Sequence, residues 1–412
     1  MVPVLASLAV NLTISSNLLM ALGIPYDAPG GSWLVKLHPA SWLALLSGVL
    51  LLARDRQPVT TVRRLLAAEA ATCAFLALMA VCVLFTAVAT GSDNAVVFLD
   101  TFMPAGVLAL VASQAGPRAR RRCGLLVLGL LAGNALLCLG ETLAGRHLLT
   151  VYLADQPLIE PPGEFRGTAL YDHPLTGATL TAMGVFMLPA TRLARAVRAG
   201  LLALFLVGLL GFGERTALAA TLGTLALRGG LRCVARLRSG RLRGRDLAAG
   251  VTAALAIAGL IGGLLAWTSI GERIRLRAYW DASAATRSVE WQALGLLDIR
   301  EALFGVGYAR LAALAAQLDL RVAFGGFETL WLLMFLHLGA FGGVFFLIGF
   351  GTLLIGLWRR SAATGRMMLV VVIAVASASN SLARKSDILS VLVPCLYAVM
   401  PDPRRGFRLP VR

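Results

Sequence analysis

The fold class is decided by one stretch at residues 332–357, which reads LLMFLHLGAFGGVFFLIGFGTLLIGL. No Asp, Glu, Lys or Arg interrupts it, and Arg359 and Arg360 follow directly after Trp358. About 20 apolar residues are enough for a helix to cross the hydrocarbon core of a bilayer. The stretch therefore predicts a membrane-spanning helix whose end is marked by basic residues.

The same pattern recurs along the whole chain. Of its 412 residues, 58% are hydrophobic and only 14% are charged, whereas soluble domains carry about 25% charged residues. We therefore predict a single all-α integral membrane domain over residues 1–412, beginning with an uncleaved helix. Its twelve predicted spans are approximately 3–22, 38–53, 66–90, 95–114, 124–144, 174–190, 199–212, 216–230, 247–268, 332–357, 367–382 and 387–400.

The net charge of +17 has two interpretations, which the positions of the arginines separate. A nucleic-acid-binding protein would show basic patches interleaved with aromatic residues, and the sequence has none, so no nucleic-acid partner is expected. The arginines instead form short clusters between apolar runs, as loops on the cytoplasmic side of a membrane do. With the N-terminus inside, the inner loops hold 25 of the 38 basic residues. This pattern predicts cytoplasmic termini, a bacterial inner membrane location and a periplasmic active face.

Three connecting segments stand out for length or charge. Residues 145–173 and 269–327 are predicted outer loops, and 228–246 is a predicted basic cytoplasmic loop. Within the longer outer loop, Leu311, Leu314 and Leu318 recur at helical spacing between polar residues. That spacing predicts a short amphipathic helix on the membrane surface.

The residues suited to chemistry gather in four outer sequence segments. They are FRGTALYDHP with Arg166 and His173, GFGERTAL with Arg215, ATRSVEW with Arg287 and Glu290, and FGGFETL with Glu328. An arginine near membrane depth is costly unless it faces protein or a water-filled cavity, so each is a functional hypothesis. A planar guanidinium binds phosphate oxygens in bidentate fashion. Converging arginines would therefore hold a diphosphate.

Structural roles remain open for some of these residues. Arg215 could instead pair with Glu214 or with lipid headgroups. His173 precedes Pro174 and could order a turn, and His337 is interpreted as a packed, hydrogen-bonded core residue. No Cys/His cluster, D-x-D arrangement or Walker motif is present in the sequence, so neither a metal, a cofactor, a nucleotide-sugar donor nor ATP is expected.

With these motifs the chain resembles the O-antigen ligase/polymerase superfamily, and most closely its polymerase-type members of exopolysaccharide and capsule biosynthesis. The family places an arginine before a Gly-rich turn and a proline, as Arg166 is placed here. A further arginine precedes a tryptophan and a G-x-G, like Arg287, Trp291 and Gly305–Gly307. Ligases of the family then show His-[Asn/Ser/Gln], nine residues and Gly-x-x-Gly. The spacing is kept from Glu328 to Gly339, but glutamate replaces the histidine.

The resemblance implies inverting, metal-independent glycosyl transfer from an undecaprenyl-diphosphate-linked saccharide to a hydroxyl of a second lipid-linked repeat unit. The partners would be these lipid-linked oligosaccharides, membrane lipid and other polysaccharide-export proteins. Arg215 and Arg287 would hold the diphosphate, with Arg166 and Arg384 beside them.

The absence of the ligase histidine weakens the ligase interpretation and leaves the general base open. Glu328 is the first choice, because it occupies the position of that histidine, and His173 and Glu290 are its rivals. Three other functions remain: an O-antigen-type ligase, a flippase or transporter of lipid-linked saccharide, and a non-enzymatic assembly factor.

Overall fold

The computed structural model describes most of the chain. The described residues are 1–28, 31–54, 57–153, 156–157, 165–240, 282–320 and 326–401, with isolated positions between 244 and 262. The predicted span 247–268 lies almost wholly outside the described residues.

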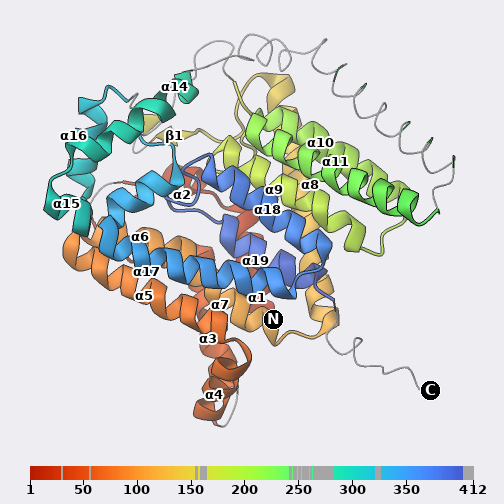
Figure 1. Ribbon diagram of the computed structural model, residues 1–412, viewed down its shortest axis with the longest axis horizontal. Helices are drawn as coiled ribbons and strands as arrows, with labels where there is room; N and C mark the ends of the chain where they lie inside the picture. The colour runs from red at the N-terminus through yellow and green to blue at the C-terminus, as the bar shows by residue number, and fades with distance from the viewer. Residues whose placement is uncertain are drawn as a thin grey trace.

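The described residues form helices joined by short connections, with one two-stranded hairpin of β1 and β2 (Figure 1). The first half contains α1 Val2–Thr13, α2 Ser16–Ala21, α3 Pro39–Ala53, α4 Pro58–Ala68, α5 Ala70–Ala89, α6 Ser92–Val97, the π-helix η1 Phe98–Phe102, α7 Met103–Ser113, α8 Pro117–Ala144, β1 Tyr152–Leu153, β2 Gln156–Pro157, α9 Pro174–Met187 and the 3₁₀ turn η2 Leu188–Ala190. The second half contains α10 Arg195–Phe212, α11 Arg215–Arg238, α14 Ala282–Val289, the 3₁₀ helix η3 Glu290–Leu296, α15 Ile299–Phe304, α16 Tyr308–Gln317, α17 Leu330–Arg360, α18 Ala363–Ser377 and α19 Ile388–Val399.

Five helices of the described chain are long and apolar enough to cross a membrane. They are α5, the continuous run Asp93–Ser113 through η1 and α7, α8, α10 and α17. Shorter apolar helices lie in the predicted spans 3–22, 38–53, 174–190, 367–382 and 387–400. The predicted span 216–230 lies in the 24-residue helix α11, which is not among the helices apolar enough to cross a membrane. The first predicted span, 3–22, is broken between α1 and α2, where the Ser15 side chain accepts the Leu18 amide and starts a new helix. The all-helical prediction is confirmed at this level.

Two predicted features differ from the structure. The first half of the basic segment 228–246 is not a loop, because α11 continues to Arg238. Leucine, alanine and arginine are strong helix formers, so charge alone does not end this helix. The apolar face of α16 also turns inward: Leu314 is fully buried, and Leu311 packs against the protein core. The apolar face of α16 therefore packs against the protein and not against lipid.

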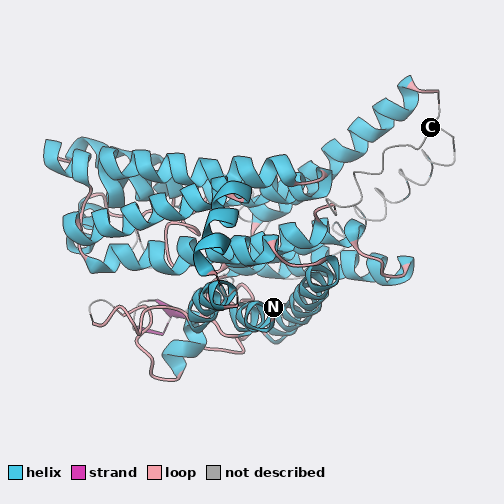
Figure 2. Ribbon diagram, turned by 90° about the horizontal axis from the view of Figure 1, so that it is seen from below, coloured by secondary structure: helices cyan, strands magenta, loops and turns pink. Residues whose placement is uncertain are grey.

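The helices pack around an aromatic core. α17 lies along α5, α10 packs against α8 and α9, and α19 contacts α7 and α8 (Figure 1). Figure 2 shows that helices make up almost all of the described chain and that the strands lie at one edge. Phe102 of η1 meets Phe346 and Phe350 of α17 edge to face, with ring centroids 5.3 and 5.9 Å apart. Such aromatic contacts stabilise a pair beyond the area they bury. They fix the side of α17 that faces the interior.

Residues 282–320 lie at one end of the bundle, and two glycines allow them to contact α17 closely. Figure 1 shows α14, α15 and α16 grouped there beside α17. Gly339 interrupts α17 with φ 60° and ψ −170°, and Gly305 after α15 has φ 84°. A Cβ at Gly339 would lie 2.4 Å from the Leu303 carbonyl carbon, and one at Gly305 would lie 2.5 Å from the His337 oxygen. Two backbones therefore touch where any side chain would separate them.

We expect Gly339→Ala to destabilise the protein by about 1–3 kcal/mol, because alanine tolerates neither the positive φ nor the backbone contact. Thermal unfolding in detergent measures this loss. Gly343→Ala in the same helix is the control, because an added Cβ there meets no atom within 4 Å. Equal unfolding temperatures for the two variants would show that the contact is not essential.

Candidate functional site

The first cluster of site residues lies where the segment before α9 crosses the turn between α10 and α11. The Arg166 Nη1 atom is 2.7 Å from the Glu214 Oε1 atom, and both side chains are largely buried. The Gly167 amide donates to the Gly211 carbonyl at 3.3 Å, which holds the two segments together. Arg215 is the first residue of α11 and is exposed. Glu214 thus pairs with Arg166, and Arg215 adjoins this pair as the next residue along the chain.

The second cluster surrounds Glu328, just before α17. Arg287 of α14 donates from Nε to the Glu328 carboxylate at 3.2 Å. The Glu328 side chain is only 14% exposed. From the other side, the Asn380 amide donates to the Phe327 carbonyl at 2.8 Å. Two of the sequence-predicted site residues, 41 positions apart, are therefore an ion pair.

Arg384 joins the two clusters from the loop between α18 and α19. Thr101 of η1 fixes this loop, donating to the Arg384 carbonyl at 3.0 Å and accepting from the Ser386 amide at 3.0 Å. The charged and polar groups that interact electrostatically with Arg384 come from four segments of the chain. They are Asp27, Asp172, Tyr308 and Glu328.

His173 connects the same region to Arg166. Its Nδ1 accepts the Leu175 amide at 3.1 Å and caps α9, as the turn-ordering interpretation predicted. Its surroundings lower its pKa from 6.5 to about 3, first by burial and then through the charges of Arg166 and Arg384. Solvent nevertheless reaches both His173 and Arg384. We place the candidate site around these groups, which protein surrounds and water still reaches, and call this region the recess.

No family model, curated protein or solved structure matches this chain. The candidate site therefore stands on its own geometry. Five of the six site residues predicted from the sequence converge through direct contacts or through shared electrostatic neighbours: Arg166, His173, Arg287, Glu328 and Arg384.

Carboxylates line the part of the recess next to Arg384. Burial raises the pKa of Asp172 from 3.8 to about 6. The Asp27 carboxylate is 3.1 Å from the Lys385 ammonium. Carboxyl groups with pKa values near neutrality exchange protons with a substrate more readily than ordinary surface carboxylates do.

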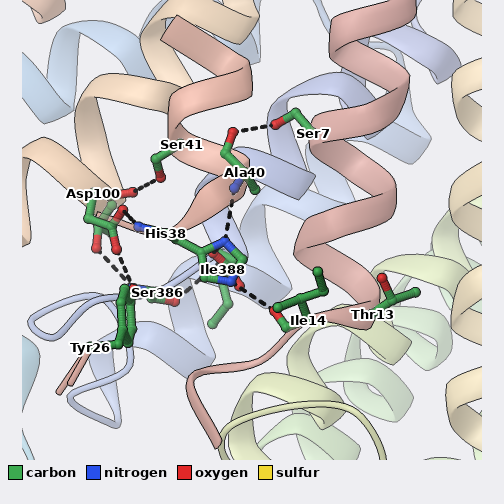
Figure 3. A network of polar contacts seen from close by, with 12 residues as sticks. Ser7, Thr13, Ile14, Tyr26, His38, Ala40, Ser41, Asp100, Ser386 and Ile388 are labelled. Atoms are coloured by element: carbon green, nitrogen blue, oxygen red, sulfur yellow. Dashed lines mark hydrogen bonds and ion pairs between the residues drawn. The ribbon is translucent and has the colours of Figure 1, made fainter. Parts of the chain in front are cut away.

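A second polar network lies beside the recess and was not found by sequence reasoning (Figure 3). The His38 amide donates to Asp100 at 2.8 Å, and the His38 Nε2 atom is 2.8 Å from the Ile14 carbonyl oxygen. The Tyr26 hydroxyl donates to the second carboxylate oxygen of Asp100. Asp100 belongs to the π-helix η1, an element that occurs often at functional sites. This network fixes the segment before α3 against the Arg384 loop.

Buried polar side chains of apolar helices hold the outer segments in place. The Glu141 carboxylate of α8 accepts the amides of Leu148, Thr168 and Ala169 at 2.6–2.7 Å. Asn134, two turns earlier, accepts the Leu170 amide at 3.2 Å. The available signal was an isolated Asn or Glu inside an apolar run, which marks a functional or structural demand for a polar group.

His337 differs from the interpretation as a hydrogen-bonded core residue. It is 94% buried, but its Nδ1 atom has no hydrogen-bond partner among the described residues. It lies within the electrostatic reach of Arg384. His337 therefore faces the polar interior and is not part of a closed hydrogen-bond pair. Over the described part of the chain, no group of three His, Cys, Asp or Glu side chains is arranged to hold a metal ion.

The low pKa of His173 predicts an acid-sensitive fold. An unfolded chain binds a proton on this histidine near pH 6.5, whereas the folded protein does so only near pH 3, so its contribution to stability is lost as pH falls through this window. His173→Asn keeps a side-chain cap for α9 and removes the titration. We expect its thermal stability to fall less than that of the wild type between about pH 7 and pH 5. Parallel pH dependences would contradict this assignment.

Proposed function

We propose that this protein is a membrane glycosyltransferase that polymerises undecaprenyl-diphosphate-linked saccharide repeat units into surface polysaccharide. It would lie in the bacterial inner membrane with twelve spans and both termini in the cytoplasm. The recess would face the periplasm. The observation that carries this proposal is the convergence of Arg166, Arg287 and Arg384 on two proton acceptors, Glu328 and His173, beside apolar helices.

The arrangement suits a diphosphate leaving group on a lipid. Arg166 pairs with Glu214, Arg287 pairs with Glu328, and Arg384 interacts electrostatically with Asp27, Asp172 and Glu328. A donor diphosphate would compete with these carboxylates for the three guanidinium groups. A membrane-bound donor brings its diphosphate to the end of the apolar helices, where these groups lie. Bidentate hydrogen bonds from arginine would hold the phosphate oxygens and neutralise the charge that develops as the bond breaks.

The proposed reaction is a single displacement. A hydroxyl oxygen of the acceptor saccharide attacks the anomeric carbon of the donor, and the bond from that carbon to the diphosphate oxygen breaks. The electron pair leaves with undecaprenyl diphosphate, and Glu328 accepts the hydroxyl proton. In the structure Arg287 occupies the Glu328 carboxylate. The donor diphosphate would take over Arg287 and free that carboxylate for the acceptor.

The alternative functions give different products in one assay. Purified protein in liposomes is supplied with a lipid-diphosphate-linked repeat unit, and the products are separated by size. A polymerase yields a ladder of repeats, a ligase transfers preformed chain to another acceptor, and a flippase makes no new bond. A ladder supports the proposal, and the other two results overturn it.

The arginines give the next prediction. Arg287→Ala and Arg384→Ala should each lower the polymerisation rate by about 10²–10³-fold, as loss of one charge-stabilising donor does. Arg310→Ala is the matched control, because Arg310 of the same outer segment pairs with Glu301 at 2.7 Å and is remote in its contacts from Glu328. Full activity of both site variants at wild-type expression would show that these arginines are structural.

The proposed orientation is tested by cysteine labelling. The side chains of Arg300 and Arg238 are both exposed, the first on α15 and the second at the end of α11. In intact spheroplasts a membrane-impermeant maleimide should label Arg300→Cys, and it should label Arg238→Cys only after lysis. The reverse pattern would place the recess on the cytoplasmic side.

A further inference from the structure

Glu290, the first residue of η3, is a fully buried carboxylate with an unusual set of partners. Its side chain is 0% exposed. Its Oε2 accepts the Glu328 amide at 2.6 Å and the Thr329 amide at 3.3 Å, and its Oε1 accepts the Thr329 hydroxyl. Burial raises the pKa of this carboxyl above 4.5, and the hydrogen bonds oppose the change. A buried carboxylate is costly unless its oxygens are satisfied, and here both are.

These bonds are made to the two backbone amides directly before α17. Thr329 is the N-cap residue of α17, but its side chain makes no capping bond within the helix. The first amides of a helix have no partner inside it, and an N-terminus favours negative charge. Glu290 supplies an acceptor and a charge at this end of α17. The acceptor for these two amides therefore comes from a segment 38 residues earlier in the chain.

Arg287 and Glu290 act on one residue from two sides. They lie three positions apart, so they share a face of the turn from α14 into η3. Arg287 binds the Glu328 carboxylate, and Glu290 binds the Glu328 amide. The first contact is an ion pair that a competing anion can replace. The second is buried and holds the backbone.

We propose that Glu290 is a positioning residue that keeps the Glu328 carboxylate in the recess when the donor diphosphate takes Arg287 away from it. This inference rests on the proposed function. Glu290 itself does not serve as the base, because its side chain is inaccessible and both of its oxygens are already engaged. The sequence interpretation named Glu290 as a rival candidate for the general base. Its proposed role is now to position Glu328.

The kinetic test compares Glu290→Ala with Glu290→Gln. Glu290→Ala should lower kcat by about 10–100-fold, the usual cost of losing a supporting hydrogen bond to a reacting group. The KM for the lipid-linked donor should stay unchanged, because the arginines remain. Glu290→Gln should retain most of the activity, since its amide oxygen still accepts both backbone amides. Glu328→Gln provides the inactive reference. A loss for Glu290→Gln as large as for Glu290→Ala, or a rise in KM alone, would overturn the proposal.

A second measurement separates this proposal from the proposed function. Hydrogen–deuterium exchange of a peptide covering residues 326–335 should speed up in Glu290→Ala and stay at the wild-type rate in Glu301→Ala. Glu301 is the matched carboxylate, because it pairs with Arg310 within the same outer segment. Unchanged exchange in Glu290→Ala would reject the positioning role of Glu290 even if the wild type makes polymer. Faster exchange would support the positioning role of Glu290 even if no polymer is made. In that case only the proposed polymerisation reaction fails.

Thr329→Val covers the case in which Glu290→Ala does not fold. It removes the hydroxyl donor to Glu290 and keeps both amide bonds. The kcat of Thr329→Val should fall by less than the fall predicted for Glu290→Ala. Its hydrogen–deuterium exchange should be faster than that of the wild type. Wild-type kinetics and exchange together in this variant would contradict the proposal.

Discussion

The contact of two backbones at Gly305 and Gly339, where no side chain intervenes, is the constraint on which the position of residues 282–320 depends. The break in α17 leaves the Leu336 carbonyl without a helical partner, and the Val306 amide donates to it at 2.7 Å. Asn94 of α6 completes the junction by donating to the Val306 carbonyl at 3.0 Å. Residues 282–320 are thereby joined to the bundle through main-chain groups, which have little freedom to adjust. Arg287 and Glu290 reach the start of α17 from a segment that is already fixed at α15.

A second principle links the other connecting segments around the recess to the apolar helices. Connecting segments expose amides and carbonyls that must be satisfied wherever they are buried. In this protein side chains of the helices meet that need, as Asn17 does for Tyr152 at 3.0 Å and for Asp172 at 3.0 Å. Each such bond crosses a long stretch of sequence. The recess is therefore lined by loops whose positions are set from below, by the helices.

The sequence predicted what depends on local composition. Apolar runs located the helices, and the candidate residues Arg287 and Glu328 were each found from their own segment. Their pairing was not foreseeable, because it brings together α14 and the start of α17 through tertiary packing. For the same reason the partners of His38 could not be predicted from the sequence. They are Ile14, directly after α1, and Asp100 of η1. The Gly-x-x-Gly motif was recognised by its spacing, whereas its backbone contact with Gly305 appears only in three dimensions.

Where charge and local propensity disagree, the structure follows propensity. Four of the basic residues that indicated a cytoplasmic loop lie on the last turns of α11, since a cluster of arginines is compatible with both helix and loop. They are Arg228, Arg232, Arg236 and Arg238. In the Pro-containing segment 145–173 the structure describes the short β1–β2 pairing, and the outer location of this segment stays a prediction.

The π-helix η1 makes the length of this part of the chain as important as its composition. Asp100 and Thr101 are adjacent, yet one binds the segment before α3 and the other binds the loop before α19. A π-turn holds one residue more than an α-turn, so the extra residue sets the direction of both side chains. Removing a single residue from η1 would rotate the preceding residues by about 100° relative to α7, as one α-helical step does. Two segments remote in sequence would then lose their common anchor, although no anchoring side chain had been replaced.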